Sequence, residues 1–189
     1  MIIDNRLTAQ FLQRHMNTND WQTEFRKVYD LGVAAWNEGR RSAQAMFDDK
    51  DAAFLATIGC TAQELFDFVD DFHRYGEPDF ATTLAVAAIR RDYFLNVMRG
   101  KWTGRTATME SLPAKTAEVE GIVWLPRIIA KARLKLRGEM PADLMYGCAG
   151  DRPFLRKMNL DLPRFLKLVW ECGDDTRRIV EAVKKSARL

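Results

Sequence analysis

The segment Asp51–Val69 reads DAAFLATIGCTAQELFDFV, and Asp151–Val169, which reads DRPFLRKMNLDLPRFLKLV, aligns onto it without a gap. Self-similarity at a fixed spacing indicates that one structural unit is used twice. The two segments agree at their apolar positions, which recur at the spacing of one helix face. These matched positions are Phe54 and Phe154, Leu55 and Leu155, Ile58 and Met158, Leu65 and Phe165, Phe66 and Leu166, Phe68 and Leu168, and Val69 and Val169.

The residues at the helix boundaries follow the same scheme in both segments. Gly59 and Asn159 are the residue types that best adopt the left-handed conformation in which many helices end. Side chains of aspartate and threonine accept hydrogen bonds from the free N–H groups at a helix start, so two N-caps are predicted in each segment. The predicted caps are Asp51 and Thr61 in the first segment and Asp151 and Asp161 in the second.

The outer faces of the two matched helices differ in charge. Glu64, Asp67 and Asp70 correspond to Arg164, Lys167 and Trp170, so the core face is kept while the solvent face changes sign. Trp170 is predicted to pack against the other half, although an exposed tryptophan at this position would favour an interface with a partner.

The rest of the chain extends the helical pattern outward. Residues 21–36 form one apolar stripe in which Gly32 would allow another element to approach closely. The helix that follows Pro78 is apolar nearly all round and is expected to be central. Residues 99–118 lose this periodicity and are the predicted linker. No strand is expected to matter.

We therefore expect an all-α fold: a single compact helical domain, residues 1–189, of about eight helices built from two related halves. The halves span about 19–98 and 119–189, and the irregular linker 99–118 joins them. Composition agrees with a globular chain, since 47% of residues are hydrophobic and 29% are charged.

Several features favour a soluble protein in a reducing, cytoplasmic compartment. The three cysteines have no C-x-x-C spacing. The first ten residues, MIIDNRLTAQ, lack the pattern of a signal peptide. The longest apolar stretches are far too short to cross a bilayer, so no membrane association is expected.

The net charge of +3 hides an asymmetry between the ends of the chain. Residues 1–100 carry 15 acidic and 11 basic residues (−4), and residues 101–189 carry 11 and 18 (+7), which sum to +3. The basic part could attract an anionic partner, face the acidic part, or lie in solvent. The residues alone leave these three interpretations open.

The segment Gly121–Leu155 contains the strings WLPR, KAR and YGC-x-x-DR. It resembles the bacterial domain of unknown function 5069 family, and the strings FLATIGCTAQELFDFVDDF and AAIRRDYF resemble its longer members. The resemblance extends from about Trp36 to the C-terminus. It implies a bacterial cytoplasmic origin but no activity, because the family has none assigned.

Arg91 is the leading candidate for a ligand-binding residue. It lies on the helix that is apolar nearly all round, where a guanidinium must be paired with a carboxylate or with carbonyl groups. An internal salt bridge is one interpretation, and an anion site at the base of a pocket is the other. Arg90, Tyr93 and Arg127 are further candidates for the same pocket.

The loop Met145–Arg152 is the second candidate. Its two glycines allow close approach of the backbone, and a helix N-terminus follows, where anions are favoured. Tyr146, Cys148 and Arg152 are its candidate ligand-binding residues. Cys148 could also act as a catalytic thiol, although no histidine lies nearby in the sequence.

Metal and cofactor chemistry have little support. His15 and His73 are the two histidines, and Asp70 and His73 lack the second motif that a helical di-metal site needs. No metal site and no cofactor are therefore predicted. Five basic residues decorate the helix after Pro126, but they form no single stripe and are interpreted as a solvated face.

The function predicted from these features is a non-catalytic binding or interaction module. It would hold a small anionic ligand or a protein partner between the halves, near Arg91, Tyr146 and Arg152. An enzyme that uses the Cys148 thiol is one alternative. Weak nucleic-acid association through the basic C-terminal half is another.

Overall fold

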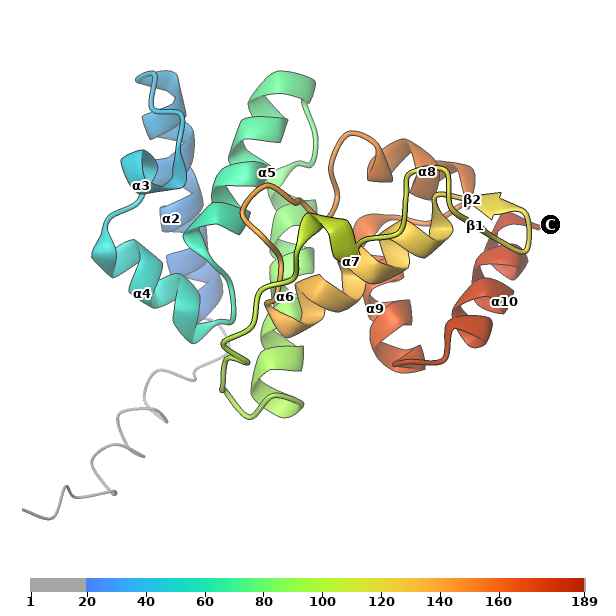
Figure 1. The fold of residues 1–189 in the computed structure, drawn as a ribbon. Helices are drawn as coiled ribbons and strands as arrows, with labels where there is room; N and C mark the ends of the chain where they lie inside the picture. The colour runs from blue at the N-terminus through green and yellow to red at the C-terminus, as the bar shows by residue number, and fades with distance from the viewer. Residues whose placement is uncertain (1–19, 189) are drawn as a thin grey trace, which may run out of the picture.

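A computed structural model describes residues 20–188, and within them the chain is almost entirely helical (Figure 1). The predicted all-α fold is thus confirmed. The α-helices are α2 (Asp20–Asn37), α3 (Ala43–Met46), α4 (Asp49–Thr57), α5 (Ala62–Tyr75), α6 (Phe80–Asn96), α7 (Leu125–Arg137), α8 (Asp151–Lys157), α9 (Leu162–Cys172) and α10 (Thr176–Ala187). A 3-10 turn, η1 (Met109–Ser111), and two short strands, β1 (Glu118–Val119) and β2 (Ile122–Val123), lie between α6 and α7.

Two apolar cores lie on either side of α6 (Figure 1). One core is formed mainly by α2, α4 and α5, and the other mainly by α7, α8, α9 and α10. Neighbouring residues of α6 serve different cores, since Val86 belongs to the second and Ala87 to the first. Because α6 is covered on both sides, its near-uniform apolar sequence is explained, and its predicted central position is confirmed.

The helix boundaries agree with the sequence at most positions. Thr61 and Asp161 cap α5 and α9 as predicted, and Thr61 also forms a capping box with Glu64. Gly59 and Asn159 both have positive φ angles, of 72° and 54°. The duplication of the two halves stays a prediction that these corresponding ends support.

Two predicted caps are wrong. Asp48, three residues before Asp51, caps α4 and forms a capping box with it, so Asp51 lies inside the helix. Gly150 precedes α8, and the Asp151 carboxylate accepts a hydrogen bond from Trp124 Nε1 at 3.0 Å instead of capping the helix. The predicted absence of a signal peptide at residues 1–10, and His15, lie outside the described residues.

The linker packs along α7. Its Leu112 forms a small apolar cluster with Leu134 and Leu144, and Ala107 N donates a hydrogen bond to Glu139 O at 2.9 Å. Two-residue strands β1 and β2 then form an antiparallel hairpin that leads into α7. The segment is irregular, as predicted, but it is held against the C-terminal half.

No single helix between residues 20 and 188 has the length and apolar character needed to cross a bilayer. The bent pair of α4 and α5, which meet at 101°, meets these criteria of length and composition when taken together.

Gly32 allows α2 to lie against the rest of the first core, as its place in the apolar stripe predicted. A Cβ atom placed on Gly32 would lie 2.9 Å from the Phe47 ring and 3.2 Å from Val69 Cγ2. Overpacking of this kind costs roughly 1–3 kcal/mol. Alanine would regain only about 1 kcal/mol of helix propensity.

We therefore expect Gly32→Ala to lower the free energy of unfolding by roughly 1 kcal/mol in urea denaturation. Ala34→Gly, at an exposed position of the same helix, measures the propensity effect alone. A Gly32→Ala protein more stable than the wild type would contradict the close contact.

Candidate binding site at the junction of the two halves

The acidic face of α5 meets basic residues of α7 and α8, and we call this contact region the junction. Glu64 Oε1 forms an ion pair with Lys135 Nζ at 2.9 Å, and the two side chains are only 12% and 3% exposed. The prediction that Glu64 faces solvent is therefore wrong. Glu64 is buried because the oppositely charged Lys135 of α7 pairs with it. The acidic and basic parts of the chain therefore contact each other, at least in part, inside the molecule.

The five basic residues of α7 were predicted to form a solvated face, and this prediction is also wrong. Lys131 and Lys135 are buried, and the remaining three bind groups of the chain itself. Arg127 donates to Pro113 O at 2.7 Å, Arg133 to Gly173 O at 3.1 Å, and Arg137 pairs with Glu139 at 2.8 Å.

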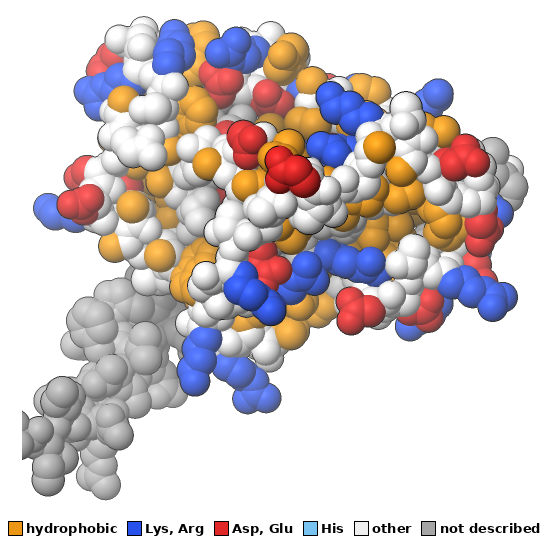
Figure 2. Space-filling model, viewed as in Figure 1, with side chains coloured by type: hydrophobic (Ala, Val, Ile, Leu, Met, Phe, Trp, Pro, Cys, Tyr) orange, Lys and Arg blue, Asp and Glu red, His pale blue; other side chains and the backbone are white. Residues whose placement is uncertain are grey.

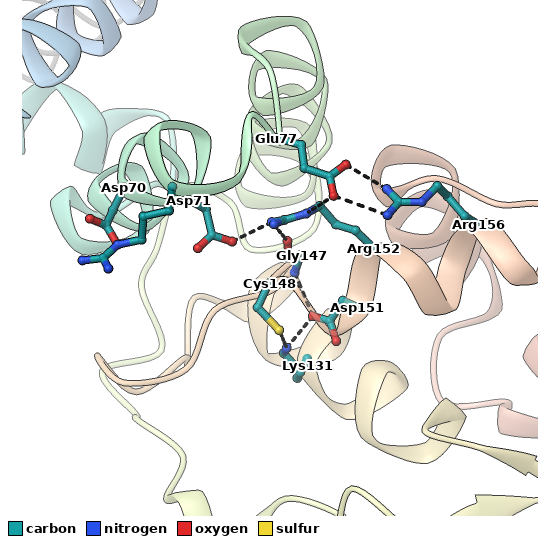
Figure 3. A network of polar contacts seen from close by, with 10 residues as sticks. Asp70, Asp71, Glu77, Lys131, Gly147, Cys148, Asp151, Arg152 and Arg156 are labelled. Carbon is teal, nitrogen blue, oxygen red and sulfur yellow. Dashed lines mark hydrogen bonds and ion pairs between the residues drawn. The ribbon is translucent and has the colours of Figure 1, made fainter.

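Arg152 is the centre of the junction on the α8 side (Figure 3). Its Nη1 donates to Asp71 Oδ2 at 2.6 Å and to Gly147 O at 2.7 Å, while its Nε lies 3.1 Å from Glu77 Oε1. The side chain is only 5% exposed. Burial raises the pKa of the Asp71 carboxyl, and the hydrogen bond from Arg152 opposes that rise.

Asp67 lies one turn before Asp71 on α5. Burial raises the pKa of Asp67 to about 7, and a hydrogen bond from Gln63 Nε2 at 2.8 Å partly offsets this effect. The face of α5 that was predicted to be solvated is thus partly removed from water.

Arg156 follows Arg152 by one helical turn and binds the same carboxylate (Figure 3). Its Nη1 lies 2.8 Å from Glu77 Oε2. Hydrogen bonding by Arg156 lowers the pKa of Glu77. In contrast to Arg152, Arg156 is 58% exposed and Glu77 is 39% exposed, so this pair can open to solvent without loss of the core.

The Glu77 carboxylate lies at a pocket of about 360 Å³ between the α5–α6 turn and α8–α9. Such a volume is within the range of small-molecule sites. The lining combines two guanidinium groups, three carboxylates and an apolar floor. Its residues include Arg152, Arg156, Glu77, Asp79, Asp161, Thr82, Leu155, Leu160 and Leu162.

A second polar cluster lies below Arg152 in Figure 3. Lys131 forms a buried ion pair with Asp151, and its Nζ also donates to Cys148 Sγ at 3.2 Å. Asp151 Oδ2 accepts a hydrogen bond from Gly147 N at 2.9 Å. The cluster therefore fixes the loop that carries Cys148, which is itself partly exposed.

The sequence-predicted site residues fall into two groups. Tyr146, Cys148 and Arg152 lie together in the loop and α8, where Tyr146 is buried and donates to Leu162 O at 2.8 Å. Arg91 is elsewhere, with its guanidinium 5.1 Å from the Trp21 ring.

The other predicted residues also serve contacts within the chain. Tyr93 packs edge-on against Trp170 with ring centroids 5.6 Å apart, so Trp170 packs against the other half as predicted. Arg90 is fully enclosed, whereas the Arg91 side chain is 11% exposed. The reason is that Arg90 shares the most buried stripe of α6 with Val86 and Phe94.

Sequence analysis missed Glu77, Arg156, Lys131 and Asp79 as site residues. Among residues 20–188, no three side chains of the metal-binding types come close enough to hold a metal ion. His73, which was considered for metal binding, hydrogen-bonds through Nδ1 with Val69 O at 2.8 Å and stacks on Trp36.

These features define an all-α protein with a charged junction and a pocket beside it. The family model described as Domain of unknown function (DUF5069) matches residues 110–189, which run from η1 to the C-terminus. The predicted family resemblance is confirmed over this part of the chain. Neither the curated proteins nor the solved structures contain a match.

The two arginines of α8 carry the same charge but differ in burial, so comparing them shows how much burial contributes to stability. Arg152→Gln would leave two carboxylates without their buried cation, which typically costs about 3–5 kcal/mol. Arg156→Gln removes an exposed pair worth at most about 1 kcal/mol. Urea denaturation of both variants measures the difference, and equal losses of stability would show that burial does not decide the contribution of Arg152.

Proposed function

We propose that the protein is a non-catalytic binding module for a small ligand that carries an anionic group. The ligand would occupy the pocket beside the junction, with its anionic group held by Arg152 and Arg156. One observation carries this proposal: two guanidinium groups of one helix converge on a single, partly exposed carboxylate at a pocket.

Glu77 supports the proposal because its carboxylate marks where a ligand anion would bind. Arginine guanidinium groups bind carboxylates and phosphates by the same parallel N–H donors. The Arg156–Glu77 pair is exposed enough for its two members to separate at small cost. A ligand carboxylate could therefore replace that of Glu77.

The remaining lining favours a ligand with both charges. Once Glu77 turns away, the pocket is lined by the two arginines and by Asp79 and Asp161, whose carboxylates cap α6 and α9. A dianion would be repelled by these aspartates, whereas an ammonium group would be attracted. The leucines of the floor, Leu155, Leu160 and Leu162, suit an apolar side chain. The ligand class is thus a small zwitterion such as an aliphatic amino acid or a short peptide.

Calorimetric titration with leucine, 4-methylpentanoate and inorganic phosphate tests this proposal. We expect leucine to bind most tightly, since 4-methylpentanoate lacks its ammonium group and phosphate lacks its apolar group. Glu77→Gln should tighten leucine binding about tenfold by removing the competing carboxylate, and Arg156→Gln should weaken it about tenfold.

Arg177→Gln is the matched control, because Arg177 is an exposed, ion-paired arginine on α10 outside the pocket. It should leave the affinity unchanged. If the Glu77→Gln protein binds none of the three probes at millimolar concentration, the pocket is not a site for this class of ligand.

A second candidate function uses Cys148 as a reactive thiol. It is favoured by the 3.2 Å contact between Lys131 Nζ and Cys148 Sγ, which places an ammonium group beside a partly exposed sulfur. Asp151 holds the same ammonium group, so Lys131 would act through its charge.

For this candidate we expect iodoacetamide to alkylate Cys148 near neutral pH at least about tenfold faster than free cysteine. Mass spectrometry locates the label. Cys60 is an internal control, because burial raises the pKa of its thiol to about 11. A rate for Cys148 no higher than that of free cysteine would remove the candidate.

A further inference from the structure

Arg90 is a buried cation without a nearby ion-pair partner. Its side chain is fully enclosed, and among residues 20–188 no carboxylate lies within ion-pair distance of it. Glu64, the acid whose charge acts on it, is already paired with Lys135. Enclosing a guanidinium in this way costs several kcal/mol unless its donors are satisfied. Arg90 therefore differs from Arg152, which has three polar partners.

One edge of the guanidinium has no hydrogen-bond partner within the described part of the chain. Its Nη1 contacts Met98 Sδ at 3.5 Å, while Nε and Nη2 are both unsatisfied. The N–H groups of Nε and Nη2 on this edge point in the same direction. They form the fork by which arginine binds two oxygens of one carboxylate or phosphate.

Trp102 covers this region of Arg90. The Arg90 Cζ lies 5.2 Å from the centre of the Trp102 ring and 5.3 Å from that of Phe94. A Cβ atom placed on Gly138 would lie 2.5 Å from both Arg90 Nη2 and the Trp102 ring. A side chain at position 138 would thus fill the space beside the free edge of Arg90. Because residue 138 is glycine, the Trp102 indole can occupy this space.

The segment that carries Trp102 is exposed and basic, and a glycine lies on either side of the tryptophan. Residues 99–105 read RGKWTGR, and Trp102 itself is 37% exposed. Gly100 and Gly104, on either side of the tryptophan, both have φ angles of 68°. The chain turns back here at the end of α6 (Figure 1), and Lys and Arg side chains gather on the lower part of the face in Figure 2, around the linker.

The charged groups around Arg90 explain how it is tolerated. Glu64 favours its charged form, and the C-terminal end of α7 at Gly138 presents carbonyl groups of negative potential. Lys135 partly cancels the first effect, because it holds the Glu64 carboxylate. These groups compensate the charge through space and leave the two donors without hydrogen bonds.

We infer that Arg90 is the base of a second ligand site, separate from the pocket, which binds one carboxylate or phosphate group when Trp102 moves aside. The ligand anion would accept hydrogen bonds from Nε and Nη2, and the basic residues of segment 99–105 would attract it. Trp102 acts as the cover of the site.

The Nε–H resonance of Arg90 in a proton–nitrogen correlation spectrum reports on this site directly. Arg90→Lys assigns the resonance by its loss. Inorganic phosphate and acetate, titrated into the wild-type protein at constant ionic strength, distinguish the two oxyanion classes. We expect at least one of them to shift the resonance saturably, and Trp102→Ala to lower the midpoint about tenfold.

Arg156→Gln is the matched control and should leave the Arg90 titration unchanged, so the two sites can fail independently. In the Arg156→Gln background, which weakens the pocket, Arg90→Met fills the same space without a charge; it should raise the Tm of the isolated protein and abolish the response of the Tm to the anion. The inference is overturned if neither anion moves the Arg90 resonance in the wild type or in Trp102→Ala. It is also overturned if, in the Arg156→Gln background, Arg90→Met leaves the anion-dependent Tm shift unchanged.

Discussion

The ion pair between Glu64 and Lys135 crosses from one half of the molecule to the other with both side chains almost out of water. A carboxylate and an ammonium group each lose several kcal/mol of hydration on burial, so neither can remain there without the other. The contact of Arg152 with Asp71 imposes the same condition one helix further along. These contacts fix α5 against α7 and α8, and they bring Arg156, Glu77 and the pocket to their places.

Helix positions and ends could be predicted because they depend on local chemistry. Thr61, Glu64 and Asp161 form caps through bonds to the nearest few residues, and Gly59 and Asn159 end helices through their own backbone conformations. Asp151 shows the limit of this approach. Its sequence context is that of a cap, but Lys131, twenty residues earlier, draws its carboxylate into the interior. A partner so distant leaves no local pattern.

The candidate site was harder to predict for the same reason. Periodicity identified α6 as central, yet it favoured Arg91 over Arg90 as the enclosed arginine, because two cores cover the helix and the more buried stripe could not be told apart. Lys131 and Lys135 did leave a signal. On the circumference of α7 the two lysines lie between Ile128 and Leu134. Because Leu134 is buried as well as Ile128, the buried face of the helix is wide enough to include both lysines. Glu77 lies in a turn without periodicity, and only the fold brings it to Arg156.

The division of α6 between two cores has a consequence for what counts as a unit of this chain. Val86 and Ala87 commit adjacent residues to opposite sides, so unfolding of either core uncovers apolar surface of the other, and the two should melt cooperatively. The segment recognised by family similarity begins after α6, although α6 packs extensively against α9. Cut at that boundary, the segment would expose the face of α9 that α6 covers. The boundary drawn by homology therefore falls between two helices that pack against each other.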